Sequence, residues 1–294
     1  MKKKNTAKST AILLAGSLAA TLASQAAETP APNKSGYNFF KPTPREHLRE
    51  LSTDRPDKTE SAYTVDAGHF QIESDIVSYS RDHDTSAGAD TRVESWSIGA
   101  VNLKAGLLNW MDLQVVIDTY NRVSTDDKLN PPKVRQSGFG DITTRLKMNV
   151  WGNDGGSTAL ALMPFLKLPT NQDQLGNNAI EGGLIIPLAV ELPAGWGMGL
   201  MTEFDSIQNS TDKDYHAEFI NTVTFSHDLT EKLGFYVEFF SMVSSEAGAP
   251  WVGTVDLGLT YGVSKNLQLD AGINIGVTRS AEDINPFIGF AWRF

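Results

Sequence analysis

The sequence has 294 residues, no cysteine and a formal net charge of −10 at pH 7. A chain without cysteine has no disulfide, no catalytic thiol and no thiolate metal site. The acidic balance argues against nucleic acid as a partner, because nucleic-acid binding requires clustered positive charge.

Residues 1–26 have the pattern of a secretory signal peptide. Four lysines precede or flank an apolar run at residues 11–23, and small residues suited to cleavage follow it. The run is too short for a membrane anchor, which needs about 20 apolar residues. We therefore expect export and removal of the leader. The formal charge then falls from −10 to −14, since the leader carries four lysines and no acid.

Residues 27–65 are polar and rich in proline, with neither a helical nor a strand period. This composition predicts an extended N-terminal segment. Two arrangements remain open for it. The segment is either a periplasmic tail or a plug that is ordered against the rest of the protein.

After residue 65 the hydrophobic period is two, which is typical of strands with one apolar face. In residues 267–278 every second side chain is apolar and the others are small or polar, and residues 251–263 and 141–150 repeat this pattern. The pattern predicts about twelve strands, near residues 67–80, 91–105, 110–123, 138–151, 157–169, 178–192, 196–208, 215–228, 233–244, 251–263, 266–279 and 284–294.

The second of these strands changes phase along its length. Trp96 and Ile98 favour one apolar face, whereas Val101 and Leu103 favour the other. A bulge near Ala100 would reconcile the two halves, because one extra residue reverses the alternation.

Short turns alternate with longer, more polar loops, and the longest of these span residues 81–90 and 124–137. Short connections on one rim and long ones on the other are typical of an outer-membrane barrel. A soluble β-sandwich is the alternative, but strands of 11 to 15 residues exceed its usual length and suit a tilted bilayer crossing. We therefore predict an all-β, antiparallel, up-and-down transmembrane β-barrel over residues 66–294.

Aromatic residues support the barrel, since they gather where strands end, as in interfacial girdles. The chain also ends in an alternating apolar strand that closes with Phe294, which resembles the assembly signal of bacterial outer-membrane barrels. We therefore expect the barrel-assembly machinery and outer-membrane lipid as partners. The girdle candidates are Trp110, Trp151, Trp196 and Trp292 on the short-turn rim, with Tyr79, Tyr120 and Trp251 near the long-loop rim.

Two stretches resemble the outer-membrane transporter family named for the meta-pathway of phenol degradation. They are Thr53-Asp54-Arg55-Pro56-Asp57 and Gly68-His69-Phe70-Gln71-Ile72-Glu73, and the barrel hairpins that follow extend the resemblance over most of the mature chain. The resemblance implies transport, without proving phenol as the substrate.

The inward phase of the predicted strands carries charges. A twelve-stranded barrel should leave a narrow, partly filled pore. These charges then form either a selectivity path for small solutes or an internal salt-bridge network that fills the barrel. The predicted lumen-lining residues are Glu73, Asp75, Asp118, Arg145, Lys147, Lys167, Glu203, Asp205, Glu238, Asp256, Asp270 and Arg293.

The sequence offers little support for an enzymatic function. None of the five histidines begins a His-x-Ser pair, and no Gly-x-Ser-x-Gly elbow occurs. Asp82, Asp84 and Asp90 lack the ordered spacing of a calcium loop. We therefore expect no catalytic residue, no cofactor and no metal site. The predicted function is a passive outer-membrane channel for small organic solutes, with a lipid-acting barrel enzyme and a non-transporting structural barrel as alternatives.

Overall fold

The computed structural model describes residues 33–85, 88–209 and 211–294. The predicted signal peptide, residues 1–26, lies outside the described residues, as does the start of the predicted N-terminal segment. Among the described residues no helix is long and apolar enough to cross a membrane.

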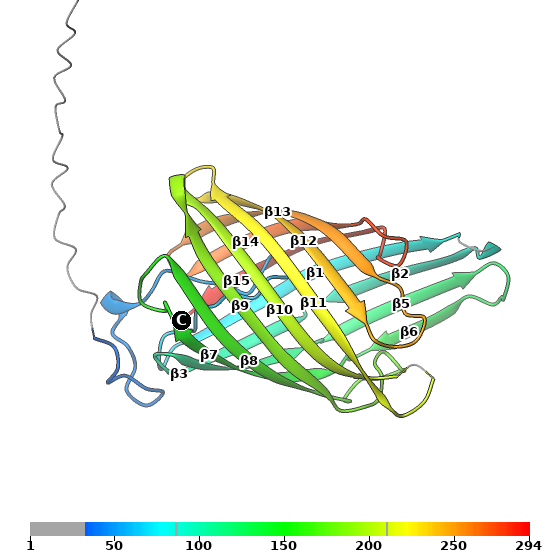
Figure 1. Ribbon diagram of the computed structural model, residues 1–294, viewed down its shortest axis with the longest axis horizontal. Coiled ribbons are helices and arrows are strands. Elements are labelled where there is room, and N and C mark those ends of the chain that lie inside the picture. Colours follow the sequence, from blue (N-terminus) through cyan, green and yellow to red (C-terminus); the bar gives the residue numbers. More distant parts are fainter. Residues whose placement is uncertain (1–32, 86–87, 210) are drawn as a thin grey trace, which may run out of the picture. The chain divides into compact units, whose positions relative to one another are not determined.

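Strands make up most of the structure (Figure 1), and two single-turn 3-10 helices, η1 and η3, interrupt the chain at Arg45–His47 and Pro193–Gly195. The strands are β1 (Phe70–Asp84), β2 (Thr91–Ile98), β3 (Val101–Leu108), β4 (Met111–Ile117), β5 (Tyr120–Asp127), β6 (Val134–Gly138), β7 (Ile142–Trp151), β8 (Thr158–Leu168), β9 (Glu181–Leu192), β10 (Trp196–Gln208), β11 (Tyr215–Asp228), β12 (Leu233–Ser244), β13 (Val252–Ser264), β14 (Leu267–Gly276) and β15 (Ile284–Arg293).

The strands form a closed antiparallel barrel (Figure 1). The last strand, β15, pairs with β1, so the wall has no open seam between the chain's first and last strands. Three wall strands are interrupted, because β2 continues into β3, β4 into β5 and β6 into β7. Counted in this way, the described residues contain twelve barrel strands, which confirms the predicted fold.

The first interruption lies where the phase of the sequence changes. β2 ends at Ile98 and β3 begins at Val101. Between them Gly99 has φ +69°, a left-handed conformation that glycine adopts without a Cβ clash. The register of β1 against β15 also shifts between Asp75 and Val77. The irregularity expected near Ala100 is therefore present.

Two connections predicted as long loops are partly strand, which corrects the predicted ranges 81–90 and 124–137. β1 continues to Asp84, β5 runs to Asp127, and β6 begins at Val134. The strands β1, β2, β5 and β6 pair in that order and project past the rest of the wall (Figure 1). Outside a bilayer neither face of a strand has to be apolar, so the hydrophobic period does not reveal such extensions.

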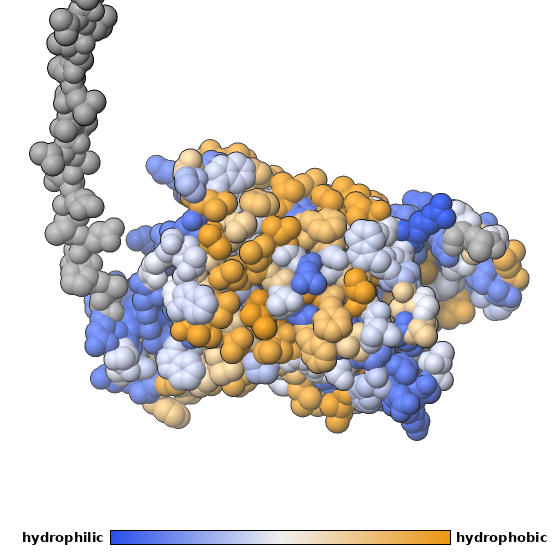
Figure 2. Space-filling model, viewed as in Figure 1, coloured by the Kyte–Doolittle hydropathy of each residue, from blue (hydrophilic) through white to orange (hydrophobic). Residues whose placement is uncertain are grey.

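The wall has an apolar outer face and a polar inner face. In β13, Leu257 is 38% exposed, whereas its neighbour Asp256 is fully buried. The register places Asp256 between Glu238 of β12 and Asn274 of β14, so inward residues of adjacent strands lie side by side. Figure 2 shows hydrophobic side chains over the middle of the wall and hydrophilic ones toward its two ends. This distribution is typical of a lipid-facing barrel.

The predicted tryptophans lie at strand ends with exposed rings, whereas Tyr79 and Tyr120 lie within wall strands that continue past them to Asp84 and Asp127. The four tryptophans of the short-turn rim are 39–48% exposed, and Tyr120 and Trp251 near the long-loop rim are 42% and 49% exposed. Such rings suit the two membrane interfaces, where one edge is apolar and the other wet.

Candidate functional site

The interior of the barrel is occupied by a re-entrant loop, residues 52–64, which comes from the predicted N-terminal segment. Its backbone pairs with side chains of the wall instead of with a strand. Val65 N donates to Asp112 Oδ2 at 2.9 Å, and Thr64 N donates to Asn153 Oδ1 at 3.1 Å. The two stems meet where Ser52 Oγ and Ser61 Oγ lie 2.6 Å apart. The wall thus satisfies polar groups that would otherwise be buried without partners.

Asp66 holds the base of the re-entrant loop at the short-turn rim. Its carboxylate has no exposed surface and lies 3.1 Å from Lys34 Nζ and 3.6 Å from guanidinium nitrogens of both Arg49 and Arg293. Arg49 also donates to the Thr64 carbonyl at 2.7 Å. Three cations around one buried carboxylate connect the segment before the loop, the loop itself and the last strand.

Asp54 occupies the next level of the lumen. It forms ion pairs with Lys104 of β3 and Lys147 of β7, and Lys104 also pairs with Glu73 of β1. Burial alone would raise the pKa of Asp54, but the two ammonium groups lower it below its ordinary value. Asp54 is therefore ionised inside the barrel and is neutralised by two strands of the wall.

Arg55 links the loop to the nearby strands β1 and β14. Its guanidinium lies 2.8 Å from Asp75 of β1 and 2.6 Å from Asp270 of β14. It also lies over the ring of Phe287, 5.8 Å from the centroid. Arginine suits this position because its planar guanidinium can bind two carboxylates and stack on an aromatic ring at the same time.

Lys58 and Thr59 contact β11, β12 and β13. Lys58 Nζ lies 3.0 Å from Asp256 Oδ2, and Lys58 N donates to Glu238 at 2.8 Å. Thr59 Oγ1 lies 2.6 Å from Thr222 Oγ1 and 2.5 Å from Glu238 Oε1. The tip of the loop is thus bonded to three adjacent strands.

Glu60 faces the remaining side of the lumen. Its carboxylate lies 2.6 Å from Arg145 of β7, and its backbone N–H points at the sulfur of Met201 in β10. Burial, with the charge of Asp54, raises the pKa of Glu60 to about 7, although Arg145 acts in the opposite direction. Glu60 is therefore a loop carboxyl whose charge changes near neutral pH.

The structure brings most of the sequence-predicted lumen residues against the loop or its base and leaves the others apart. Lys167 pairs with Glu181 at 2.5 Å, on the wall itself. Those in contact with residues 49–66 are Glu73, Asp75, Arg145, Lys147, Glu238, Asp256, Asp270 and Arg293. Those without such a contact among the described residues are Asp118, Lys167, Glu203 and Asp205.

Sequence reasoning missed Lys104 and the charged loop residues that bind the wall. Lys104 follows Leu103, whose outward phase was recognised, so the alternation after the break at Gly99 could have found it. Lys58 and Glu60 lie in a stretch without any period, and no local signal marks their partners in β7 and β13.

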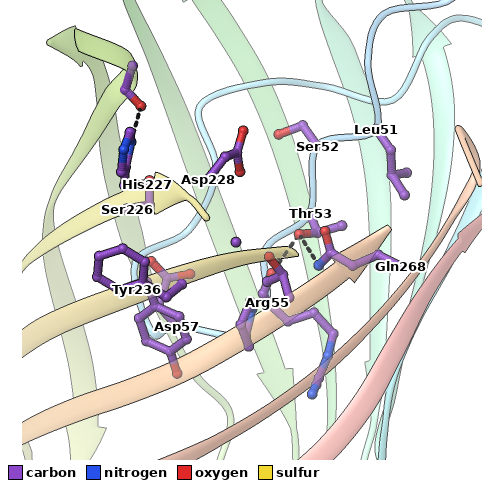
Figure 3. A pocket seen from close by; sticks show the side chains of 15 residues that line it. Leu51, Ser52, Thr53, Arg55, Asp57, Ser226, His227, Asp228, Tyr236 and Gln268 are labelled. Carbon is purple, nitrogen blue, oxygen red and sulfur yellow. Dashed lines mark hydrogen bonds between the residues drawn. The ribbon is translucent and has the colours of Figure 1, made fainter. Parts of the chain in front are cut away.

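A cavity of about 330 Å³ lies between the re-entrant loop and strands β11 to β14 (Figure 3). The loop contributes Thr53, Arg55 and Asp57, and the wall contributes Tyr236 and Gln268. Burial, with the charge of Glu238, raises the pKa of Asp57. Figure 3 also shows His227 bonded to the Gly195 carbonyl, at 2.9 Å. The lining is polar, and the loop forms one side of it.

A second space beside the loop follows β9 and β10. It measures about 250 Å³ and is bordered by Asp57 and Glu60 of the loop and by Gly197 and Gly199 of the wall. A Cβ on Gly199 would lie 2.9 Å from the methyl group of Thr59. Gly199 therefore makes room for the loop in a crowded strand.

Histidines and acidic loop residues do not assemble a reactive centre in the described part of the chain. His69 contacts the Thr43 carbonyl, His83 the Asp90 carboxylate and His216 the Asn209 amide, and none of these partners is a nucleophilic hydroxyl. Among the described residues, no group of three or more histidine, aspartate or glutamate side chains could hold a metal ion.

Comparison with known proteins gives one family and a set of barrels. The family described as "Putative MetA-pathway of phenol degradation" matches residues 53–294. An outer membrane channel from Pseudomonas putida F1 superposes with a TM-score of 0.53 at 12% identity, over 77% of this chain and 93% of that one. The translocator domain of the autotransporter NalP from Neisseria meningitidis gives a TM-score of 0.48 at 10% identity, over 77% and 88% of the two chains. No curated protein matches.

Proposed function

Because the chain belongs to the "Putative MetA-pathway of phenol degradation" family, we propose that it is an outer-membrane channel for small organic solutes, aromatic and other hydrophobic ones among them. Passage is passive and follows the charged lumen. The re-entrant loop, residues 52–64, closes this path at rest and opens it when it leaves the wall.

One observation carries the proposal. The loop that fills the lumen is joined to the wall by ion pairs and hydrogen bonds and not by strand pairing, apart from a small apolar contact of Ala62 and Tyr63 with the alanines of β8. Asp54, Arg55 and Lys58 reach β3, β14 and β13, respectively. Polar contacts of this kind exchange with water when the loop moves, so the barrel can keep its wall while the lumen opens.

The lumen also has an apolar strip on one side, which supports organic solutes as cargo. Met163, Ile185 and Met201 of β8, β9 and β10 are buried together, with Phe165 and Ile220 packed against them. Inward residues of barrels are usually polar, so such a strip is unusual. It offers the surface that an aromatic ring would contact beside the charged loop.

The proposed location in the outer membrane also assigns a function to each end of the chain. Residues 1–26 direct export, and Phe294 is recognised by the barrel-assembly machinery. The last residue is accessible for such recognition, because its ring is 48% exposed and stacks on Phe70, 5.9 Å between centroids. Its backbone meanwhile pairs with Phe70 in both directions.

A disulfide lock tests the channel. The chain has no cysteine, so Thr59→Cys with Thr222→Cys introduces one pair, at positions whose side-chain oxygens are 2.6 Å apart. In proteoliposomes, the oxidised variant should block swelling by small sugars and phenols, and a reductant should restore it to the wild-type rate. Each single variant serves as the control.

The alternatives give different results. A structural barrel would show no swelling under either condition, even after deletion of residues 27–64. A lipid-acting enzyme would release fatty acid from the vesicles whether the lock was closed or open. Either result would contradict the proposal that the protein is a channel.

A further inference from the structure

The strands that project beyond the barrel wall carry an ordered set of outward side chains. In β1, Tyr79 lies opposite Trp96 of β2, and Trp96 lies opposite Arg122 of β5. The rings of Tyr79 and Trp96 are 4.7 Å apart, and Trp96 is 46% exposed. Arg122 therefore continues the row of aromatic side chains at the long-loop rim.

The next outward row lies two residues farther from the barrel. It runs from Arg81 of β1 through Glu94 of β2 and Ser124 of β5 to Arg135 of β6. One row beyond, Arg92 lies opposite Asp126. Adjacent strands are about 4.8 Å apart and same-face residues about 6.8 Å, so these arginines span roughly 15 Å.

In the described part of the chain, the arginines of this face are not held by close ion pairs, although the charge of Arg92 acts on Asp126 opposite it. Arg92, Arg122 and Arg135 are exposed, and none of them has a hydrogen bond or ion pair with another described residue. Two polar atoms beneath them also lack partners, Arg81 Nε and the Oγ of Ser124, a residue that is only 9% exposed. Buried polar atoms usually have a hydrogen-bond partner, so these two are open to one that a ligand supplies.

The local charge opposes that of the whole molecule. Four arginines meet two carboxylates on this outward face, and Asp126 already binds Lys128 at 2.7 Å. The chain as a whole has a net charge of −10. A positive face on an acidic protein fits an anionic partner.

The position of the face defines that partner. Aromatic belts lie at the level of lipid headgroups, and the arginines begin in the row of Trp96 and extend outward from it. Guanidinium groups bind phosphate oxygens through two parallel hydrogen bonds. We propose that Arg81, Arg92, Arg122 and Arg135 form a binding site for the phosphorylated headgroup of a lipid in the outward-facing leaflet.

Lipid binding by the purified full-length protein tests the site. Native mass spectrometry in detergent would measure binding of an acylated glucosamine disaccharide that carries two phosphates, with its dephosphorylated form as the matched ligand. We expect the wild type to retain the phosphorylated lipid at least tenfold better. The double variant Arg122→Gln, Arg135→Gln should lose this preference.

A matched control is the double variant Lys232→Gln, Lys265→Gln, which removes two exposed charges from short turns at the opposite rim. It should bind the phosphorylated lipid as the wild type does. Equal binding of the two lipids by the wild type would overturn the proposal, as would equal losses in both double variants. Binding of inorganic phosphate that displaces the lipid at equal concentration would mean a simple anion site and would also overturn it.

Discussion

The guanidinium of Arg55 lies 2.6 Å from the carboxylate of Asp270, although 215 residues separate them in the sequence. The same guanidinium pairs with Asp75 of β1, so one loop side chain contacts two wall acids. Contacts of this kind decide whether the loop stays in the lumen.

Arg55→Met should release the loop. The substitution leaves Asp270, which is 6% exposed, without its cation, and removing one partner of a buried pair costs about 3–5 kcal/mol. Planar-bilayer recordings should show more frequent or longer openings than in the wild type. Lys128→Met, which removes an exposed pair with Asp126, should leave the openings unchanged. If Arg55→Met opened as often and for as long as the wild type, the loop would have no role in gating.

Gating should depend on pH through Glu60. In the inserted loop its pKa is about 7, against 4.5 in water, so the inserted state binds the extra proton between these values. Insertion is therefore stabilised below about pH 4.5, and this stabilisation is lost as the pH rises through 7. Openings should be several-fold more frequent at pH 8 than at pH 5.5.

Two features separate this effect from other titrations. The pKa of Asp54 is lowered, so its stabilising charge is lost only in acid, below the range of the measurement. Burial raises the pKa of Asp57, so Asp57→Asn is the matched comparison for Glu60→Gln. An unchanged pH slope in Glu60→Gln would show that other groups control the opening.

A charge on the outer face should destabilise the barrel. Leu257 faces outward near the middle of β13, and arginine at the bilayer midplane costs about 2–4 kcal/mol. Asp256 is a poor inward control, because it is buried and pairs with Lys58. Thr260→Arg is better, since Thr260 borders two internal cavities. Refolding titrations in lipid vesicles should show the larger loss for Leu257→Arg. Equal losses would mean that the inner and outer faces are reversed.

The long-loop rim should face the outside of the cell, as the longer loops of such barrels do. Lys128→Cys on this rim should react with an impermeant maleimide on intact cells, and Glu231→Cys in an exposed short turn should react only after lysis. Asn153, in another short turn, is 8% exposed and would label poorly. The reverse labelling pattern would invert the topology.

The open channel should prefer cations, because Glu203 and Asp205 are lumen acids without an ion pair among the described residues. Glu203→Gln with Asp205→Asn should move the reversal potential under a salt gradient toward zero, most clearly at low salt, where screening is weak. Glu238 is left intact, since it holds Thr59 and its loss would disturb the loop. No cation preference in the wild type at low salt would mean that the acids are balanced within the barrel.

The barrel could be predicted because the alternation of apolar and polar residues that produces it is local and recurs from strand to strand. A strand between lipid and lumen must alternate, so residues 267–278 reveal their inner and outer faces without knowledge of their neighbours. The break between β2 and β3 followed from the same reasoning, since a phase change requires an extra residue.

The position of the loop could not be predicted in this way. Its contacts join residues 54–60 to strand residues 19 to 215 positions later, and such pairs leave no period in the sequence. Lumen charges such as Asp256 could be recognised as inward, but their partners could not, because a polar residue inside a barrel has water as an alternative. The projecting strands escaped detection for a related reason, since neither of their faces has to be apolar.

Both stems of the re-entrant loop leave the barrel through the same opening, where Asp66 holds Lys34 and Arg49 together. A terminal tail would have to be drawn out lengthwise, with its end passing every ion pair in turn. A chain folded back on itself can retreat and return sideways as one unit, without threading a free end and without unpairing β1 from β15. In the proposed gating, the loop would therefore leave and re-enter the lumen as a hairpin that is held at both ends, while the barrel wall remains closed.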